Sequence, residues 1–345
     1  MSVAKALVCR PLDGQNHLAL EDVPIPALQP QEVLVRISAT AQNPTDIKSF
    51  DQNRFGDGAL LGCDFCGHVE SVGGDVIEVK DGDRVAGLVQ GGRPWCLGAY
   101  ATHTIVKQAF CFKVPGSISS TAAATVPLAL ATAWLALLSP YSLGIDRTAA
   151  DQIQLLIWGG STSVGQYAIQ IARRFGFRFA TTCRNKDIVE ALGAKFVYDY
   201  RSPTVIGDIK TALPGITYVL DCVGNETSSA QASSAVCDSG GALCTIQPMK
   251  VNTQNVEKRV KVTDVVVFTA FFDDLVLGPV KIPKRKEDRV LATELYQQLP
   301  GMLSSGIIKP NRVRVVEGGL EGVVHGFQLY RDNAVSGQKL VYSIA

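Results

Sequence analysis

The chain has 345 residues, 46% of them hydrophobic, which is enough to bury a large core and predicts a division into two domains. Its formal net charge of +1 supplies no general attraction to nucleic acids or anionic membranes, so small molecules or one protein are the expected partners. Nine scattered cysteines, with no signal peptide over residues 1–10, indicate free thiols in a reducing compartment, and we expect a cytoplasmic location.

The first third of the chain has the pattern of short strands. Apolar or alternating runs lie at residues 4–9, 33–39, 67–72 and 84–88, and turns rich in Pro, Gly and Asp separate them. This part contains no glycine-rich phosphate turn. We expect a compact, mostly β domain here.

The most apolar segment of the chain runs from Ala122 to Leu138. It is short for a membrane span, and Pro127 interrupts it. We therefore predict a buried helix at a domain boundary rather than a transmembrane helix.

The stretch from Gln152 to Asn185 predicts a dinucleotide-binding unit. An apolar run at 153–158 is typical of a buried strand, residues 164–175 have helical apolar spacing, and a second strand is expected at 177–182. Backbone N–H groups at the N-terminus of such a helix bind a pyrophosphate. The turn that would present them consists of Gly159, Gly160, Ser161, Thr162, Ser163, Val164 and Gly165.

The glycine pattern of this turn is imperfect. If Gly160 and Gly165 are the first and third glycines of the dinucleotide fingerprint, Thr162 stands where the second belongs. The position between a strand and a periodic helix still favours phosphate binding over an ordinary tight connection.

The residues after the second strand favour NADPH over NADH. An NAD site normally places an acid about 20 residues beyond the glycines, whereas this chain reads Cys183-Arg184-Asn185-Lys186 and has no acid before Asp187. Cationic side chains here would attract a 2′-phosphate, and an Arg can bind it through two hydrogen bonds. The alternative is that Arg184 and Lys186 are solvated loop charges.

Expected helices and strands alternate through the rest of this region. Helices are predicted at 187–192, 205–213 and 228–237, and strands at 196–198, 218–221 and 242–246. Such alternation predicts a parallel sheet with helices on both faces. A further helix is expected at 291–303, and a last strand at 339–344 that returns to the first domain.

The loop Asp221-Cys222-Val223-Gly224 directly follows one of these strands. Open parallel sheets bind ligands beyond the carboxyl ends of their strands, so Cys222, Val223 and Gly224 are candidate contacts for the nicotinamide half of the cofactor. An ordinary turn at Gly224 is the alternative.

Five motifs, in this order, resemble those of the medium-chain dehydrogenase/reductase superfamily. They are Asn43-Pro44-Thr45-Asp46, the segment 62–69 with Gly62-Cys63-Asp64, Asp81-Gly82-Asp83-Arg84-Val85, Gly160 to Gly165, and Ser336-Gly337-Gln338-Lys339-Leu340. Within the superfamily the sequence is most similar to the fungal trans-acting enoyl reductases that serve polyketide synthases. That similarity lies in Asn43 to Lys48, Gly159 to Thr162, Thr182-Cys183 with Asn185, Val197 to Pro203, Asp221-Cys222 and Val315 to Leu320.

The resemblance implies an α/β fold in two domains. Residues 124–299 would form a Rossmann domain, a doubly wound parallel sheet that binds NADPH, and residues 1–123 and 300–345 a β-rich GroES-like catalytic domain. It also implies a partner, a polyketide synthase alone or as a hybrid with a peptide synthetase, whose acyl-carrier domain holds the substrate. Relatives in this branch suggest a monomer, whereas quinone-reducing relatives commonly form pairs.

The resemblance further implies individual roles. Ser161 and Thr162 match the phosphate turn, Tyr200 matches a tyrosine beside the 2′-phosphate, and Asn185 matches a residue at the adenine end. Lys48 and Thr132 match polar positions beside the nicotinamide and are the predicted catalytic residues; the alternatives are a surface lysine and a helix hydroxyl bonded to its own backbone. The predicted cofactor-binding residues together are Asn43, Pro44, Gly160, Ser161, Thr162, Ser163, Val164, Gly165, Cys183, Arg184, Asn185, Tyr200, Cys222, Val223, Gly224 and Lys339.

We predict no metal. Zinc-dependent members of the superfamily need a Cys in the first motif, a His-Glu pair in the second and a lobe with four cysteines. This chain has Asn43 and Cys63-Asp64 at the first two places and lacks the lobe. Cys63-x-x-Cys66 is at most half of a zinc site, and the four histidines are isolated in the sequence.

Without a Lewis acid, the site must stabilise negative charge by hydrogen bonds, which suits a conjugated carbonyl. The leading hypothesis is a reductase that adds hydride from NADPH to the β-carbon of an unsaturated polyketide thioester. One alternative is a free-standing quinone or enone reductase, and another is a nucleotide-binding accessory protein without turnover. The basic segment 281–286 could meet an acidic carrier domain or be a solvated loop.

Overall fold

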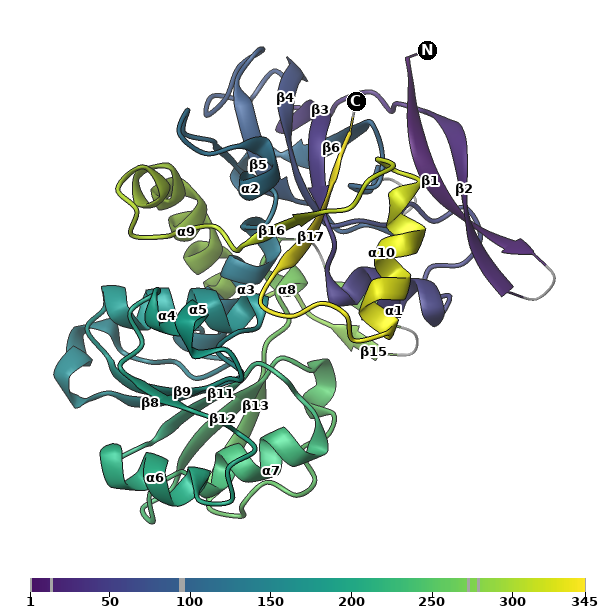
Figure 1. Ribbon diagram of the computed structural model, residues 1–345. Helices are drawn as coiled ribbons and strands as arrows, with labels where there is room; N and C mark the ends of the chain where they lie inside the picture. The colour runs from purple at the N-terminus through teal and green to yellow at the C-terminus, as the bar shows by residue number, and fades with distance from the viewer. Residues whose placement is uncertain (1, 13–14, 93–96, 272–273, 278–279, 345) are drawn as a thin grey trace. The chain divides into compact units, whose positions relative to one another are not determined.

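The computed structural model describes residues 2–12, 15–92, 97–271, 274–277 and 280–344 (Figure 1). The chain divides into two compact units. The first contains Met1–Leu128, Asp274–Ile282 and Tyr296–Ala345, and the second contains Ala129–Asp273 and Pro283–Leu295. The domain limits expected from the sequence, after residues 123 and 299, remain predictions.

The second unit is built on a six-stranded parallel sheet with the order β10-β9-β8-β11-β12-β13. The strands are β8 (Gln154–Trp158), β9 (Arg178–Thr182), β10 (Phe196–Tyr198), β11 (Tyr218–Asp221), β12 (Gly241–Thr245) and β13 (Val260–Asp264). Its helices are α4 (Ser163–Arg174), α5 (Lys186–Glu190), α6 (Val205–Ala212), α7 (Glu226–Ser234), α8 (Phe268–Phe271) and two 3₁₀ turns, η2 (Arg147–Gln152) and η3 (Pro248–Lys250). The predicted doubly wound parallel sheet is confirmed.

Helices cover both faces of this sheet, with α4 and α5 on one side and α6 and α7 on the other (Figure 1). The chain runs outward from β8 through β9 to β10 and then crosses to β11, which pairs with the other side of β8. The strand order therefore reverses between β8 and β11, and the crevice beyond the carboxyl ends of strands at such a point is where doubly wound sheets bind ligands.

One apolar cluster of this unit contains residues from the sheet and from α6 and α7. Leu156, Trp158, Val219 and Leu243 belong to strands, and Ile209 to α6, and all are buried. Because these strands are covered on both faces, their sequences are continuous apolar runs. Such runs can be recognised in the sequence, so the positions of these strands were predicted well.

The first unit contains a seven-stranded mixed sheet with the order β16-β17-β3-β4-β5-β7, in which β6 also pairs with β3. These strands are β3 (Glu32–Ala41), β4 (Asp64–Val72), β5 (Arg84–Leu88), β6 (His103–Lys107), β7 (Cys111–Lys113), β16 (Val313–Val315) and β17 (Lys339–Ser343). Two hairpins accompany it: β1 (Val3–Leu12) with β2 (Gln15–Pro24), and β14 (Leu275–Leu277) with β15 (Val280–Ile282). The expected β-rich domain is therefore confirmed.

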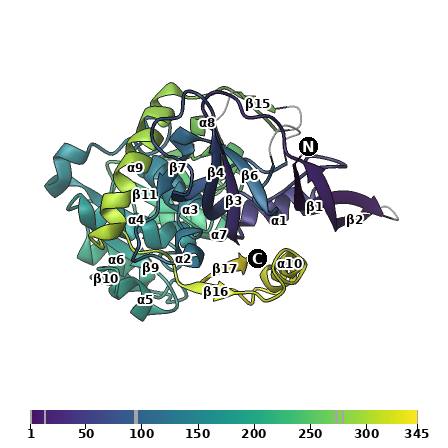
Figure 2. The ribbon, with the colours of Figure 1, turned by 90° about the horizontal axis from the view of Figure 1, so that it is seen from above.

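The last strand returns to this sheet as predicted, because β17 pairs antiparallel with β3, Val341 lying opposite Ala41. The helices of this unit are α1 (Pro44–Asp51), α2 (Ser120–Ala123), the 3₁₀ turn η1 (Gln108–Phe110) and α10 (Gly322–Arg331). Figure 2 shows α10 beside β16 and β17, and Phe327 of α10 packs with Leu7, Tyr100 and Tyr342 in one apolar cluster.

Two helices contain residues of both units: α3 (Pro127–Leu138) and α9 (Lys286–Ser304). The segment Ser120–Leu138 is apolar enough to cross a membrane, but 83% of its most apolar window is buried inside the protein. The expected buried helix is therefore confirmed. Pro127 is the first residue of α3 rather than an interruption, a position where proline fits because its missing N–H has no partner in the helix.

Candidate functional site

The predicted phosphate turn leads from β8 directly into the N-terminus of α4. Thr162 caps the helix, its Oγ1 accepting a hydrogen bond of 3.0 Å from the N–H of Gly165. The side chains from Ser161 to Val164 are half-buried, so a ligand can reach the first turn. The first N–H groups of a helix have no partner within it, and they carry the positive end of the helix dipole.

The three glycines of the turn are each required for a different steric reason. Gly159 has a φ of +86°, which favours glycine. A Cβ on Gly160 would lie 2.1 Å from Thr181 Oγ1, and a Cβ on Gly165 would lie 2.4 Å from the carbonyl oxygen of Gly159. Thr162 needs no such freedom because it has ordinary extended backbone angles, so the imperfect glycine pattern still forms the tight turn into α4.

Hydrogen bonds from the next strand and the helix hold this turn in place. The N–H groups of Gly159 and Gly160 donate to Oγ1 and the carbonyl oxygen of Thr182, at 3.0 and 2.8 Å. The buried amide of Gln166 donates to the carbonyl oxygen of Ser161 at 3.0 Å. The turn is therefore fixed in the absence of a ligand.

The residues predicted to choose between cofactors lie at the same edge of the sheet. Arg184, Asn185 and Lys186 follow β9 and are exposed, and Asn185 and Lys186 begin α5. The N–H of Cys183 donates to the carbonyl oxygen of Tyr198 at 3.0 Å, which joins the ends of β9 and β10. Burial raises the pKa of the Cys183 thiol to about 11, so it remains neutral.

The structure adds an acid to this region that the sequence argument did not consider. Asp199 follows β10, beside Tyr200, and the side chain of Arg201 donates to both of its carboxylate oxygens. This bonding lowers the pKa of Asp199 to about 2. Since Arg201 neutralises Asp199, Arg184 and Lys186 remain the cations that distinguish this edge.

The loop after β11 is organised around the buried carboxylate of Asp221. It accepts hydrogen bonds from the N–H groups of Val223 and Gly224, at 2.9 and 3.0 Å, and from the hydroxyls of Ser228 and Ser229, at 2.7 and 2.8 Å. Val223 is 38% exposed and packs close to Gly159. Cys222 is buried, which raises its pKa well above the ordinary value.

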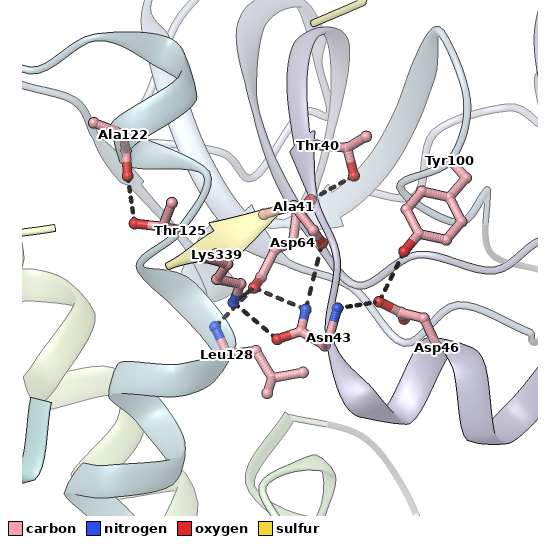
Figure 3. A network of polar contacts seen from close by, with 10 residues as sticks. All are labelled: Thr40, Ala41, Asn43, Asp46, Asp64, Tyr100, Ala122, Thr125, Leu128 and Lys339. Atoms are coloured by element: carbon pink, nitrogen blue, oxygen red, sulfur yellow. Dashed lines mark hydrogen bonds and ion pairs between the residues drawn. The ribbon is translucent and has the colours of Figure 1, made fainter. Parts of the chain in front are cut away.

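The first unit contains a buried polar network around Asp64 (Figure 3). The Lys339 ammonium donates to Asp64 Oδ2 at 2.7 Å and to Asn43 Oδ1 at 2.8 Å. Asn43 Nδ2 donates to Asp64 Oδ2 at 2.9 Å, and the N–H of Leu128 donates to Asp64 Oδ1 at 2.8 Å. We call Asn43, Asp64, Leu128 and Lys339 the Asp64 network.

A second buried acid, Asp46, lies in the first turn of α1. Its Oδ2 accepts the N–H of Asn43 at 2.8 Å and the hydroxyl of Tyr100 at 3.1 Å. Burial raises the pKa of Asp46 to about 6 in spite of these bonds. Desolvation and the nearby acids also raise the pKa of the Cys63 thiol well above its usual range.

The two predicted catalytic residues lie on separate helices. Lys48 is exposed on α1, and desolvation, followed by the charge of Arg54, lowers its pKa. Thr132 lies on α3, with 8% of its surface exposed, one turn after Leu128. Their catalytic roles, like the predicted cofactor contacts of Asn43, Pro44 and Lys339, remain predictions.

Among the residues that the structure describes, no group of three or more His, Cys, Asp or Glu side chains could hold a metal ion. Asn43 and Asp64, which stand at two positions of the zinc motifs, bond the ammonium of Lys339 instead. The eight cysteines within the described ranges are free thiols.

The basic segment 281–286 is partly neutralised. Lys281 pairs with Asp274 at 2.8 Å, and Arg285 lies 4.7 Å from the ring centre of Tyr141 and 3.8 Å from Asp288. These contacts reduce the positive charge available to an acidic partner.

Sequence reasoning missed three features of the candidate site. They are the acid Asp199, the hydrogen bond by which Gln166 holds the turn, and the position of Asp64 at the centre of a polar network. Asp199 could have been found, because it stands next to the predicted contact Tyr200. Asp64 could not, since its partner Lys339 is 275 residues away.

Two family models match the sequence. Residues 29–116 match the alcohol dehydrogenase GroES-like domain, and residues 163–272 match the zinc-binding dehydrogenase family. The first match lies in the β-rich unit, and the second covers α4 and the strands β9 to β13.

Curated relatives match nearly the whole chain. A trans-enoyl reductase of Macrophomina phaseolina is 34% identical over 336 residues, covering 93% of each chain. A trans-enoyl reductase of Aspergillus niger is 31% identical over 351 residues, covering 96% of this chain and 95% of that protein. Among solved structures, a quinone oxidoreductase from Coxiella burnetii has the same fold, with a TM-score of 0.74, 22% identity and full coverage of both chains.

Proposed function

Since the chain belongs to the trans-enoyl reductase family of the medium-chain dehydrogenase/reductase superfamily, we propose that it reduces the α,β-double bond of an acyl thioester carried by a polyketide synthase, using NADPH. The observation that carries this proposal is the helix N-terminus of α4 at the reversal of strand order, with exposed cations after the adjacent strand. A family of oxidoreductases with this geometry requires a nicotinamide cofactor.

The second unit fits NADPH. The N-terminus of α4 and the hydroxyls of Ser161 and Ser163 suit a pyrophosphate. Arg184 and Lys186 suit a 2′-phosphate, and Asp199, the acid that follows β10 at this edge, is bonded to Arg201. An NADH site would need a free carboxylate to accept the ribose hydroxyls.

When bound, NADPH supplies a hydride to the β-carbon of the thioester. The residues of the chain must then hold the negative charge that develops on the thioester oxygen. Lys48, exposed on α1, offers an ammonium that could donate to this oxygen. Thr132 offers a nearly buried hydroxyl. Water delivers the proton to the α-carbon, after which the saturated thioester stays on its carrier.

The test is the loss of NADPH absorbance with a crotonyl thioester on the carrier domain of a synthase. We expect turnover with this substrate, none with the saturated butyryl thioester, and slower turnover with NADH. Failure of the crotonyl carrier assay with competent synthase present would overturn the proposal. Binding of NADPH without turnover of any enone would indicate an accessory protein instead.

Small quinones without a carrier domain form the second arm of the same assay. The proposal expects them to be poor substrates, whereas a free-standing quinone reductase would turn them over rapidly.

The role of Lys48 is tested by Lys48→Met. We expect kcat to fall by about 100- to 1,000-fold, the usual effect of removing one donor to a developing oxyanion, while NADPH binding is unchanged. Lys107→Met, at another exposed lysine of the same unit, is the matched control and should retain full activity. Equal rates in both variants would remove Lys48 from the mechanism.

A further inference from the structure

We propose that Asp64 is the positioning residue of this enzyme, because one buried carboxylate holds the starts of both helices that carry the predicted catalytic residues. Asp64 is completely buried, and its network joins α1, which carries Lys48, to α3, which carries Thr132. The inference rests on the proposed function for the meaning of these two side chains, while the tethering itself is a property of the fold.

The first tether is the start of α3. Leu128 is the second residue of this helix, so its N–H has no partner within the helix. Asp64 Oδ1 accepts that N–H at 2.8 Å and places a negative charge at the positive end of the helix dipole. Residues four apart lie on the same face of a helix, so Thr132 lies above Leu128, one turn away.

The second tether is the start of α1. Asn43 immediately precedes this helix, and its side-chain amide points to Asp64 Oδ2, at 2.9 Å, while its backbone N–H bonds Asp46. The carbonyl oxygen of Asn43 accepts the N–H of Asp46 at 3.1 Å, as a residue at this position should. A shift of Asp64 would therefore move the entry to the helix that carries Lys48.

Lys339 completes the arrangement by balancing the charge. Its ammonium bonds Asp64 and the remaining polar atom of the Asn43 amide, and only 2% of the lysine is exposed. Figure 3 shows the side chains of Asn43, Asp64 and Lys339 pointing toward one another, with the backbone of Leu128 beside them. With both carboxylate oxygens bonded inside the protein, Asp64 is suited to hold other residues and not to react.

The experiment compares two variants that both remove the buried charges. In D64N/K339M, the amide at position 64 can still accept from Leu128, and it can donate to the Asn43 oxygen that Lys339 no longer occupies once the Asn43 amide turns over. In D64L/K339M, an apolar side chain of similar size can do neither, and replacing both charged partners is tolerated better than replacing one. Asp83→Asn, which removes the acid of the partly exposed Asp83–Lys113 pair at 2.9 Å in the same unit, is the matched control.

For the crotonyl carrier substrate, we expect kcat of D64L/K339M to fall by about 10- to 100-fold below that of D64N/K339M, because small displacements of reacting groups have effects of this size. The KM for NADPH should differ by less than about threefold between the two variants, since both carry K339M and the phosphate turn and Arg184 belong to the second unit. Expressed per NADPH-binding enzyme, the kcat of each variant is not lowered by a loss of stability alone. Equal kcat values in the two variants would overturn the proposal.

Hydrogen exchange measures the tethers without any turnover. In the ligand-free protein, amides at residues 45–48 and 128–132 should exchange faster in D64L/K339M than in D64N/K339M, and both segments should be unchanged in D83N. If exchange becomes faster in only one of the two segments, or in neither, the proposal that Asp64 holds both helix starts is refuted. If the wild-type protein reduces no enoyl thioester, the proposed function fails while the exchange result still decides the tethering.

Should D64L/K339M fail to fold, Asp64→Glu replaces it. This variant keeps the ion pair but displaces the carboxylate by one methylene, so the proposal requires faster exchange at both helix starts and a lower kcat. Wild-type exchange and wild-type kcat in a folded D64E protein would overturn it.

Discussion

The N-termini of α4 and α3 both attract negative charge, but they differ in where that charge comes from. At α4, the neutral hydroxyls of Ser161, Thr162 and Ser163 lie at a half-buried helix start, and the first turn of the helix contains no acidic residue. At α3, the chain supplies its own anion, Asp64, and buries it completely. A helix N-terminus attracts negative charge in either case. What differs is whether the chain or a ligand provides that charge.

This difference separates the proposed cofactor site at α4 from the start of α3, which has a structural role. The acid at α3 is balanced by Lys339 and bonded on both oxygens, so the start of α3 belongs to the fold. The turn at α4 is held by bonds from Thr182 and Gln166 that leave its first turn accessible.

Lys339→Met should destabilise the protein by removing the counter-charge of Asp64 at the start of α3. It leaves the carboxylate of Asp64 buried without a counter-charge, which typically costs about 3–5 kcal/mol of unfolding free energy. Urea unfolding measures the loss. Lys113→Met, at an exposed pair with Asp83, should cost less than about 1 kcal/mol. Similar losses of unfolding free energy in the two variants would show that Lys339 stabilises the fold no more than Lys113 does.

Asp46→Asn sharpens the contrast at a third helix start, that of α1. The native pKa of Asp46 is about 6 against 3.8 unperturbed, so the folded protein binds the proton more tightly and loses stability as the pH rises through this interval. At 1.36 kcal/mol per pH unit, the wild type should lose about 3 kcal/mol relative to the variant between about pH 4 and pH 7.

The variant itself should fold, because both bonds to Asp46 reach the same oxygen and an amide oxygen can accept them. Unfolding midpoints at several pH values give the difference. Parallel pH profiles of the wild type and D46N would contradict the raised pKa.

Gly165→Ala should weaken NADPH binding at the start of α4. The added Cβ would lie 2.4 Å from the carbonyl oxygen of Gly159 and 2.8 Å from Cα of Gly160, so the helix must move away from the turn. We expect the Kd for NADPH to rise by about 100-fold, as misplacements near 1 Å can do. Calorimetric titration measures it. Gly207→Ala in α6, where nothing lies within 4 Å of the added atom, should bind NADPH normally.

Arg184→Ala should have the smallest effect of the four and alter only the choice of cofactor. Loss of one charge-assisted hydrogen bond to the 2′-phosphate raises the KM for NADPH by about 10-fold, and the KM for NADH should not change. The control is Arg178→Ala, at the opposite end of the same strand. If Arg184 is a solvated loop charge, the two variants will have the same cofactor preference.

Local patterns predicted the elements of the second unit well. The strands at 196–198 and 218–221 have the predicted bounds, and α4 begins one residue before the predicted helix. Continuous apolar runs mark strands that are buried on both faces, and short connections leave few alternative arrangements. The phosphate turn was recognised for the same reason, because its strand, glycines and helix are consecutive.

Elements whose stability comes from distant contacts were missed. β2 contains a polar and partly exposed sequence and is a strand because it pairs with β1 along its whole length. The helix α10 packs Phe327 against Tyr100 and Phe50, which are more than two hundred residues earlier in the chain. Periodicity within a short window carries no information about such partners.

Neighbouring residues in the chain were enough to predict the class of fold, the glycine turn into α4 and the cations after β9. The tertiary structure alone decided that Asp199 is neutralised beside those cations and that Asp64 meets Lys339, Asn43 and Leu128. The charge and hydrogen-bonding state of a buried group depends on what surrounds it in space, and four separate segments supply the surroundings of Asp64.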